Sequence, residues 1–242
     1  MKQKVLCIFL TLFVSVGVAF AERVQIGTLF YNLNMSEHTA QVTYHKQYSS
    51  YNYPSLTTLA IPKSVEYNSV TYTVTGIERE SFTHCPGLKS VTTTSSVTRI
   101  GAWSFSRCDA LAKVTFGNSV KYIEDGAFEL CTAITRITIP NSVISIGEYA
   151  FYECSGLIDV TIGNGVKSIG GGAFIWCSNL TSIICKATTP PICKENAFKG
   201  IETSICTLYV PQESVNLYKT ADGWKEFMNI IAISETPAKV NY

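Results

Sequence analysis

The sequence predicts an α/β repeat fold, a solenoid of stacked 23-residue coils that is capped at both ends. Two observations predict this fold. Six apolar positions recur every 23 residues over five copies, and a fixed period of roughly 20 to 50 residues is typical of repeats that stack into one continuous core. In each copy, two short β-branched stretches flank a segment whose apolar residues have helical spacing. Each coil is therefore expected to contain short strands and one short helical turn.

The recurring positions form six columns, which are expected to point into the core. They are Val74, Val97, Val120, Val143 and Val166; Ile77, Ile100, Ile123, Ile146 and Ile169; Phe82, Phe105, Phe128, Phe151 and Phe174; Cys85, Cys108, Cys131, Cys154 and Cys177; Leu88, Leu111, Ile134, Leu157 and Leu180; and Val91, Val114, Ile137, Val160 and Ile183. Five coils are therefore expected at residues 74–188. Because neighbouring strands lie about 4.8 Å apart, the stack should form a short rod or gentle arc.

Residues 1–21 have the composition of a secretory signal peptide. Lys2 and Lys4 precede an uncharged apolar run over 5–20, which ends in small residues of the type that a signal peptidase reads. The run is shorter than the roughly 20 apolar residues that span a bilayer, which favours cleavage before Glu22 over an uncleaved membrane anchor. Cleavage would leave 17 basic and 18 acidic residues and no transmembrane segment. We expect a secreted or cell-surface protein, with the periplasm as an alternative.

The segments on either side of the coils are expected to cap the core, because the open ends of a solenoid expose apolar groups. Residues 22–73 place tyrosines among alternating polar residues, which predicts an irregular β cap followed by a half-coil. Residues 189–233 begin at the Pro190-Pro191 break and are expected to form a distorted last coil and a C-terminal cap. Residues 234–242 are predicted to be a polar tail.

The repeat unit resembles the BspA-type leucine-rich repeat, whose pattern is roughly Val-x-x-Ile-Gly-x-x-Ala-Phe-x-x-Cys-x-x-Leu-x-x-Val-x-Ile-Pro. The match is close over 123–140 and 146–162 and covers 74–188. In the first two coils, Thr93-Thr94 and Phe116-Gly117 replace Ile-Pro, which predicts a less regular second strand there. The resemblance implies a leucine-rich-repeat solenoid.

Composition and motifs argue against several other classes of protein. Hydrophobic residues make up 46% of the chain, charged residues 15%, and the formal charge is only +1, which excludes a disordered chain and a strongly basic nucleic-acid binder. The sequence has no Gly-x-Ser-x-Gly, His-Glu-x-x-His, phosphate-loop or Cys-x-x-Cys motif. Glu124 and Asp125 are expected to be solvated acids on an exposed turn. We therefore predict no enzyme activity, no cofactor and no metal site.

The cysteine column is predicted to be structural. A buried free cysteine packs as a small apolar residue, and parallel side chains in a ladder disfavour the near-90° torsion of a disulfide. Cys185, Cys193 and Cys206 lie outside the column, near the last coil. In an oxidising compartment two of them can pair; Cys193–Cys206 is the first candidate and Cys185–Cys193 the second.

The candidate binding residues are those that vary while the core columns do not. They are Lys113, Arg136, Trp103, Tyr122, Tyr149 and Trp176, with Tyr152 as a further turn aromatic. Lys113 and Arg136 stand beside a threonine column that should face solvent. Such a column can bind a regular lattice such as ice or glycan, but threonine also suits any exposed strand, and the column ends at Ile184.

These observations predict a secreted or cell-surface protein that binds a macromolecule and has no catalytic activity. The resemblance, rather than the spacing, implies adhesion to a host matrix protein or a cell surface. The partner would be a protein or a glycan on host or neighbouring cells, and not a nucleic acid. Two alternatives remain. One is a carbohydrate-binding accessory protein whose aromatic turn residues stack on sugars, and the other is a structural envelope component.

Overall fold

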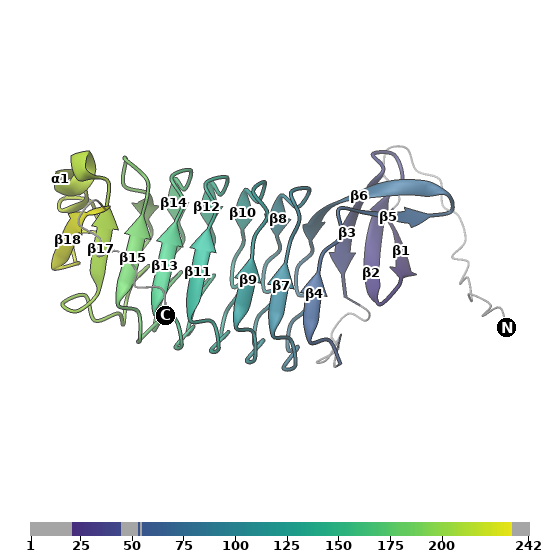
Figure 1. The fold of residues 1–242 in the computed structure, drawn as a ribbon, viewed down its shortest axis with the longest axis horizontal. Helices are drawn as coiled ribbons and strands as arrows, with labels where there is room; N and C mark the ends of the chain where they lie inside the picture. Colours follow the sequence, from purple (N-terminus) through teal and green to yellow (C-terminus); the bar gives the residue numbers. More distant parts are fainter. Residues whose placement is uncertain (1–20, 45–52, 54, 234–242) are drawn as a thin grey trace.

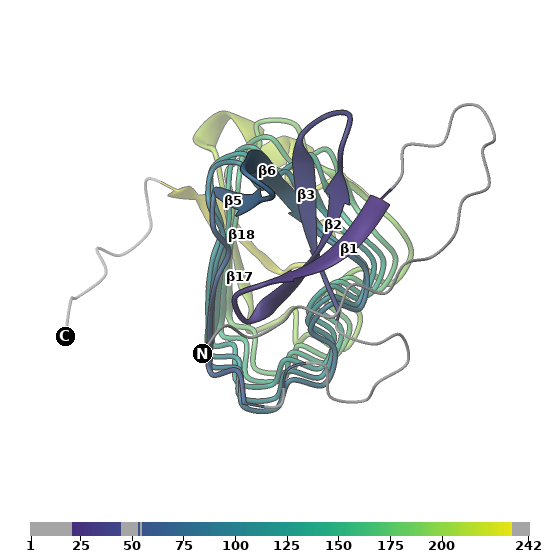
Figure 2. The ribbon, with the colours of Figure 1, turned by 90° about the vertical axis from the view of Figure 1, so that its right-hand side faces the viewer.

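The computed structural model describes residues 21–44, 53 and 55–233. Successive strands lie side by side along one long axis (Figure 1), and the coils share one outline when they are viewed from the end (Figure 2). Residues 1–20, which hold most of the predicted signal peptide, and the predicted tail at 234–242 lie outside the described residues. The described chain is an elongated β-solenoid.

Eighteen strands and two short helical segments make up the described chain. They are β1 (Ala21–Ile26), β2 (Leu29–Asn34), β3 (Thr39–Thr43), β4 (Thr58–Ala60), β5 (Ser64–Tyr67), β6 (Val70–Ile77), β7 (Ser90–Thr92), β8 (Arg99–Ile100), β9 (Lys113–Thr115), β10 (Tyr122–Ile123), β11 (Arg136–Ile139), β12 (Ser145–Ile146), β13 (Asp159–Ile162), β14 (Ser168–Ile169), β15 (Ser182–Cys185), β16 (Ile192–Cys193), β17 (Thr207–Val210), the 3-10 helix η1 (Gln212–Ser214), α1 (Val215–Tyr218) and β18 (Asn229–Ala232).

The strands form three sheets that cover two sides of the solenoid. The 10-stranded sheet has the order β1-β2-β3-β6-β8-β10-β12-β14-β16, with β5 paired to β6. The other side carries a 3-stranded sheet, β4-β7-β9, and a 5-stranded sheet, β11-β13-β15-β17-β18. The coil strands pair in parallel with a 23-residue register, as in Tyr122 with Ser145 and Arg136 with Asp159. The period in the sequence is therefore the register of the sheets.

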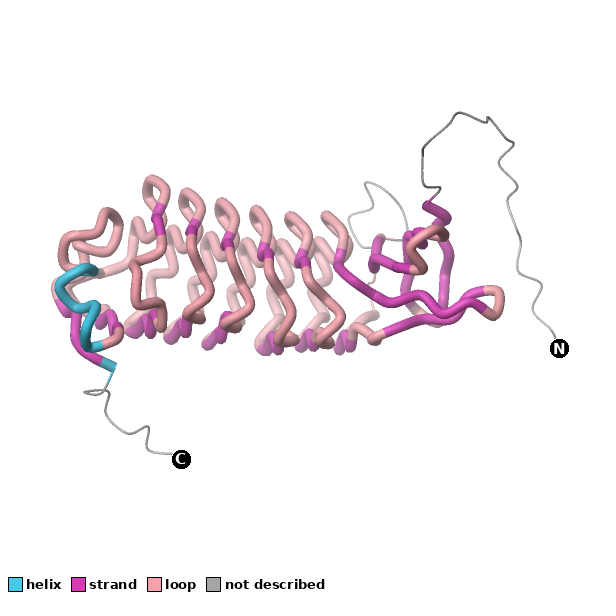
Figure 3. The backbone as a smooth tube through the Cα atoms, turned by 90° about the horizontal axis from the view of Figure 1, so that it is seen from above, coloured by secondary structure: helices cyan, strands magenta, loops and turns pink. Residues whose placement is uncertain are grey.

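The segment between the two strands of a coil consists of turns, so the expectation of a short helical turn is not met in the described coils. Each of these segments has two residues with positive φ, such as Trp103 and Arg107, or Tyr149 and Glu153. An α-helix needs φ near −63° at every residue. The N–H of Phe105 donates to the carbonyl oxygen of Ala127 in the next coil at 2.9 Å. These turns therefore bond from coil to coil, and among the residues that the structure describes helix occurs only near the C-terminal end (Figure 3).

A continuous stack of aromatic rings fills the turn side of the core. The stack runs through Tyr53, Phe82, Phe105, Phe128, Phe151, Phe174 and Phe198. Neighbouring phenylalanine rings have centroids 5.2–5.5 Å apart and planes within 9° of parallel, which is an offset-stacked arrangement. Tyr53 continues the stack at its N-terminal end, and the buried Trp224 lies 4.9 Å from Phe198 at the other end.

The second-strand side is interrupted between β9 and β11. Among the described residues no ladder pairs these two strands, although each pairs with its neighbour on the other side. Phe116 occupies the position that Ile139 and Ile162 hold in later coils, and its ring reaches Phe128 at 5.8 Å. Val114 is only half-buried, whereas the equivalent Ile137 is buried. We attribute this gap, which we call the seam, to the larger ring, and its place agrees with the irregular strand expected there.

Phe128→Ala removes a fully buried ring from the middle of the stack. We expect it to lower the free energy of unfolding by about 3–5 kcal/mol, because a large-to-small change in a packed core loses burial and leaves a cavity. Urea titration followed by circular dichroism measures this change. Ile158→Ala, at a side chain that is 41% exposed, is the control and should change the same quantity by less than about 0.5 kcal/mol. A loss below about 1 kcal/mol for Phe128→Ala would contradict an inward-facing column.

The seam should be visible in amide hydrogen exchange. The amides of Arg136 and Thr138 in β11 are expected to exchange faster than those of Asp159 and Thr161 in β13. The latter two point to β11, whereas those of Arg136 and Thr138 point to the opposite side, toward β9, with which β11 is not paired. The N–H of Asp159, for example, donates to the carbonyl oxygen of Thr135 at 3.3 Å. Native-state exchange followed by NMR measures the difference. Equal protection of the two pairs would show that β9 and β11 are paired in solution.

Candidate binding surfaces

The six predicted surface residues lie on three different surfaces. Lys113 and Arg136 are exposed on β9 and β11, on the two sides of the seam. Tyr122 lies on β10, in the 10-stranded sheet. Trp103, Tyr149 and Trp176 lie on the turns that join the two strands of a coil, which we call the turn ridge. The structure therefore does not bring the six residues together into one site.

Arg136 is held by its neighbour in the next coil. Its Nε lies 2.8 Å from Oδ2 of Asp159, which is its register partner across the β11–β13 ladder. The side chain of Arg136 is 71% exposed, so this pair contributes at most about 1 kcal/mol to stability. The partly exposed Thr161 lies beside the pair in the same ladder.

Each ridge aromatic packs over a glycine of the next coil. A Cβ atom added to Gly126 would lie 2.4 Å from the Trp103 ring, and one added to Gly172 would lie 2.6 Å from the Tyr149 ring. Trp176 has the same relation to Gly200, at 2.3 Å. Because real Cβ atoms do not approach that closely, these glycines are needed to seat the rings. The signal in the sequence is an aromatic residue followed 23 or 24 residues later by glycine.

Trp103 has a second contact that limits its use as a binding platform. The guanidinium of Arg79 lies 4.2 Å from the centre of its ring, in cation–π contact. Arg79 Nε also lies 2.8 Å from Oε1 of Glu80. Trp103 is half-buried, whereas Tyr149 and Trp176 are 47% and 50% exposed.

Three ridge residues form a connected group, which we call the aromatic patch: Tyr149, Tyr152 and Trp176. The rings of Tyr149 and Tyr152 are 5.8 Å apart at 83°, and those of Tyr152 and Trp176 are 5.7 Å apart at 46°. A hydrogen bond to the carboxylate of Glu153 raises the pKa of Tyr152, and the charge of Glu129 adds to that rise. The sequence predicts that these three aromatic residues lie on turns, but only the structure shows that they contact one another.

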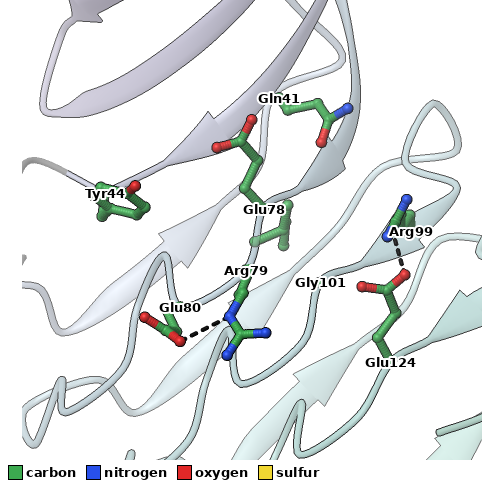
Figure 4. A pocket seen from close by; sticks show the side chains of 9 residues that line it. Gln41, Tyr44, Glu78, Arg79, Glu80, Arg99, Gly101 and Glu124 are labelled. Atoms are coloured by element: carbon green, nitrogen blue, oxygen red, sulfur yellow. Dashed lines mark hydrogen bonds and ion pairs between the residues drawn. The ribbon is translucent and has the colours of Figure 1, made fainter. Parts of the chain in front are cut away.

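A cavity of about 500 Å³ lies where the first coil meets the N-terminal strands (Figure 4). Its lining residues are Gln41, Tyr44, Ile77, Glu78, Arg79, Glu80, Arg99, Gly101 and Glu124. Nε of Arg99 lies 2.5 Å from Oε1 of Glu124, and Glu78 accepts a hydrogen bond from Asn32 at 2.7 Å. Each charged group of the lining therefore has a partner within the protein.

Glu124 is not the solvated acid that the sequence predicts. It is half-buried, and its Oε2 accepts a hydrogen bond from the N–H of Ala102 at 3.1 Å, in addition to the ion pair with Arg99. Asp125 is exposed, and its Oδ1 accepts a hydrogen bond from the N–H of Glu148 at 2.8 Å. Both carboxylates satisfy backbone groups of a neighbouring coil. The sequence did not identify the cavity, because the pairing of β3 with β6, which brings Gln41 and Tyr44 beside Glu78, lies outside the repeat period.

The column cysteines are fully buried, and Cys108, Cys131, Cys154 and Cys177 act as hydrogen-bond donors. Sγ of Cys131 donates to the carbonyl oxygen of Phe105 at 3.1 Å, and Sγ of Cys154 donates to that of Phe128 at 3.2 Å. The eight described cysteines are free, so the predicted Cys193–Cys206 bridge is not formed in the structure. Cys193 lies on β16 of the 10-stranded sheet, whereas Cys206 directly precedes β17 of the 5-stranded sheet.

The described residues contain neither a metal-binding cluster nor a membrane-spanning helix. No group of three or more histidine, cysteine or acidic side chains in that part of the chain is placed to hold a metal ion. No helix within the same residues is long and apolar enough to cross a membrane.

Parallel ladders with a 23-residue register and repeated inward aliphatic columns define a leucine-rich repeat solenoid. Residues 75–205 match the BspA type leucine rich repeat region in six copies, which is more than half of the chain. The chain therefore belongs to the BspA-type leucine-rich repeat family.

Solved bacterial structures have the same fold. A leucine rich repeat protein of T. pallidum is 23% identical, with 84% of this chain and 93% of that chain covered and a TM-score of 0.59. A leucine-rich repeat protein from Bacteroides ovatus is 19% identical, with 86% and 67% covered and a TM-score of 0.52. At these identities the likeness shows the fold alone. A search of curated proteins found no match.

The buried thiols should make stability fall at alkaline pH. Burial raises the pKa of Cys154 from 9.0 to about 12, so the folded protein keeps a proton that the unfolded chain releases. This contribution to stability is complete below about pH 9 and is lost as the pH rises from about 9 to about 12. We expect the free energy of unfolding, measured by urea titration, to fall over that window. Cys154→Ala should make the slope shallower by up to about 1.4 kcal/mol per pH unit.

Two results would contradict this expectation. One is the same alkaline slope in the wild-type chain and in Cys154→Ala. The other is rapid reaction of the column cysteines with a thiol reagent in the folded protein at about pH 8, since inert structural cysteines are buried and protonated.

Proposed function

We propose that this protein is exported and binds a protein partner through its aromatic patch, as a secreted or cell-surface adhesion protein. The leader sequence predicted at 1–21 supports export. The observation that carries the binding proposal is the contact of three aromatic side chains on adjacent coils, two of which, Tyr149 and Trp176, are about half exposed. Tyrosine and tryptophan dominate the binding energy of protein interfaces.

The support beneath the patch favours binding. Gly172 and Gly200 seat the rings of Tyr149 and Trp176, and Phe151 and Phe174 stack directly inside the same coils. A surface that is already held in place loses little side-chain freedom when a partner binds, and this reduces the cost of association. We propose no catalytic step for this surface.

Carbohydrate binding is the second candidate function. It is favoured by the exposed area of Tyr149 and Trp176, since aromatic rings can pack on the apolar faces of sugars. A third candidate surface is the strand face that carries Lys113 and Arg136. A structural role in the envelope would need neither surface.

The proposal predicts that binding depends on the patch. The full chain would be tested against arrays of purified matrix and plasma proteins and against a glycan array. For a protein ligand found this way, Tyr152→Ala and Trp176→Ala should each raise Kd by at least about tenfold, as expected for aromatic hot spots. Leu217→Ala, at a 51% exposed residue of α1, is the control and should leave Kd unchanged. Surface plasmon resonance measures each Kd.

Other results would select a different function. A glycan ligand that loses affinity in the same two variants would establish the carbohydrate alternative. Loss of affinity only in the Lys113→Ala/Arg136→Ala double variant would move the site to the strand face. No binding on either array would favour the structural role.

A further inference from the structure

The charges of the middle coils are sorted by position. The ridge turns at 124–132 and 147–155 contain no lysine or arginine. They contain five carboxylates, which are Glu124, Asp125, Glu129, Glu148 and Glu153. The basic residues of the same coils lie in or beside the strands and are exposed there; they include Lys121, Arg136 and Lys167. These two turns are therefore acidic, whereas the ridge turns on either side of the patch carry Arg107 and Lys199.

Two of these carboxylates lie next to the aromatic patch. Glu153 directly follows Tyr152 in the same turn, and Glu129 holds the position of Tyr152 one coil earlier. The two turns are in contact, because the N–H of Leu130 donates to the carbonyl oxygen of Tyr152 at 2.8 Å. Oε2 of Glu129 also accepts a hydrogen bond from Oγ of Ser106 at 3.1 Å, which fixes its position. Tyr152 is the ring that contacts both other rings of the patch. Aromatic rings and carboxylates therefore meet at one place.

This combination is complementary to a cationic side chain. A guanidinium or ammonium group is attracted to the face of a tryptophan or tyrosine ring, and it forms charge-assisted hydrogen bonds with a carboxylate. The same protein already contains the ring contact, since Arg79 lies on Trp103 at 4.2 Å. A partner that brings acidic groups would instead face like charges from Glu129, Glu148 and Glu153.

We propose that the acidic-aromatic ridge, formed by Glu129, Glu148, Tyr149, Tyr152, Glu153 and Trp176, binds an arginine- or lysine-bearing segment of a protein partner. This inference rests on the proposed function and names the chemistry of the partner surface. Arginine suits this ridge better than lysine, because its planar guanidinium both stacks on rings and donates several hydrogen bonds at once.

The test uses the full chain and a defined probe, a fluorescein-labelled peptide of nine arginines, with nine-residue glycine-serine and glutamate peptides as comparisons. Anisotropy measures binding at about 50 mM salt, where screening of surface charges is moderate. We expect the arginine peptide to bind at least about tenfold more tightly than the other two, and its affinity to fall as salt rises. Quenching of tryptophan fluorescence should disappear in Trp176→Phe, because Trp224 is buried and Trp103 half-buried.

The decisive variant is Glu129→Gln/Glu153→Gln, which removes two charges but keeps the size of the side chains and their ability to form hydrogen bonds. We expect it to weaken binding of the arginine peptide by at least about fivefold. The matched control is Glu66→Gln/Glu213→Gln, which removes the same charge from exposed positions on β5 and η1 at the two ends of the chain. It should change the affinity less than about twofold.

The outcomes separate this inference from the proposed function. If both double variants weaken the arginine peptide equally, the attraction comes from the total charge and the inference is overturned. The inference is also overturned if Tyr152→Ala reduces binding of an array ligand while Glu129→Gln/Glu153→Gln does not; in that case the proposed function stands. If Tyr152→Ala, Trp176→Ala and the glutamate variant all leave that ligand bound, the proposed function itself fails.

Discussion

The molecule depends on one constraint: each coil must place its backbone and its buried side chains directly above the same groups of the coil before it. Phe105, Phe128 and Phe151 satisfy it with ring distances of 5.2 and 5.4 Å and nearly parallel planes. Parallel ladders and stacked rings tolerate little displacement, so a change in coil length must be absorbed where coils do not touch. The register grows to 24 residues between Ser168 and Ile192, where the extra residue falls in the loop beside Pro190-Pro191, and to 25 residues between Ser182 and Thr207.

The same constraint decides which side chains the surface can carry. An aromatic ring on the turn ridge leans over the next coil, so it requires a residue without a Cβ atom there, as Trp103 requires Gly126. A large ring that points inward has the opposite effect, because Phe116 reaches Phe128 and leaves β9 without a partner in β11. The exposed aromatic residues therefore have a structural role and remain available for binding. Removing one of them affects the packing of two coils.

The sequence predicts the interior of this protein better than its turns and its sites. Equivalent inward positions repeat, so the burial of Phe128 and Cys131 follows from the period alone. The sequence predicts the turns less well, because apolar spacings of three and four residues occur both in a helix and in these turns. The positive φ at Tyr149 adds to the difficulty, since a tyrosine does not signal that backbone conformation. The contact between Tyr152 and Trp176, like the cavity beside Arg99, depends on side-chain directions and long-range pairing that no periodicity encodes.

In a repeat protein, the position of a residue within the repeat unit determines the side of the solenoid on which it lies. Residues 23 apart lie on one side of the solenoid, so the side on which a charge appears is set by its phase in the unit. Glu129 and Glu153 fall in the turn phase, and Lys121 and Lys167 fall in the strand phase. In the two middle coils the turn side is therefore acidic and the strand side carries the lysines, whereas Arg107 and Lys199 place positive charge on the turns of other coils. For such a fold, the net charge of the chain is a poor guide to the partners it can bind, and the charge of a group of neighbouring coils is the better one.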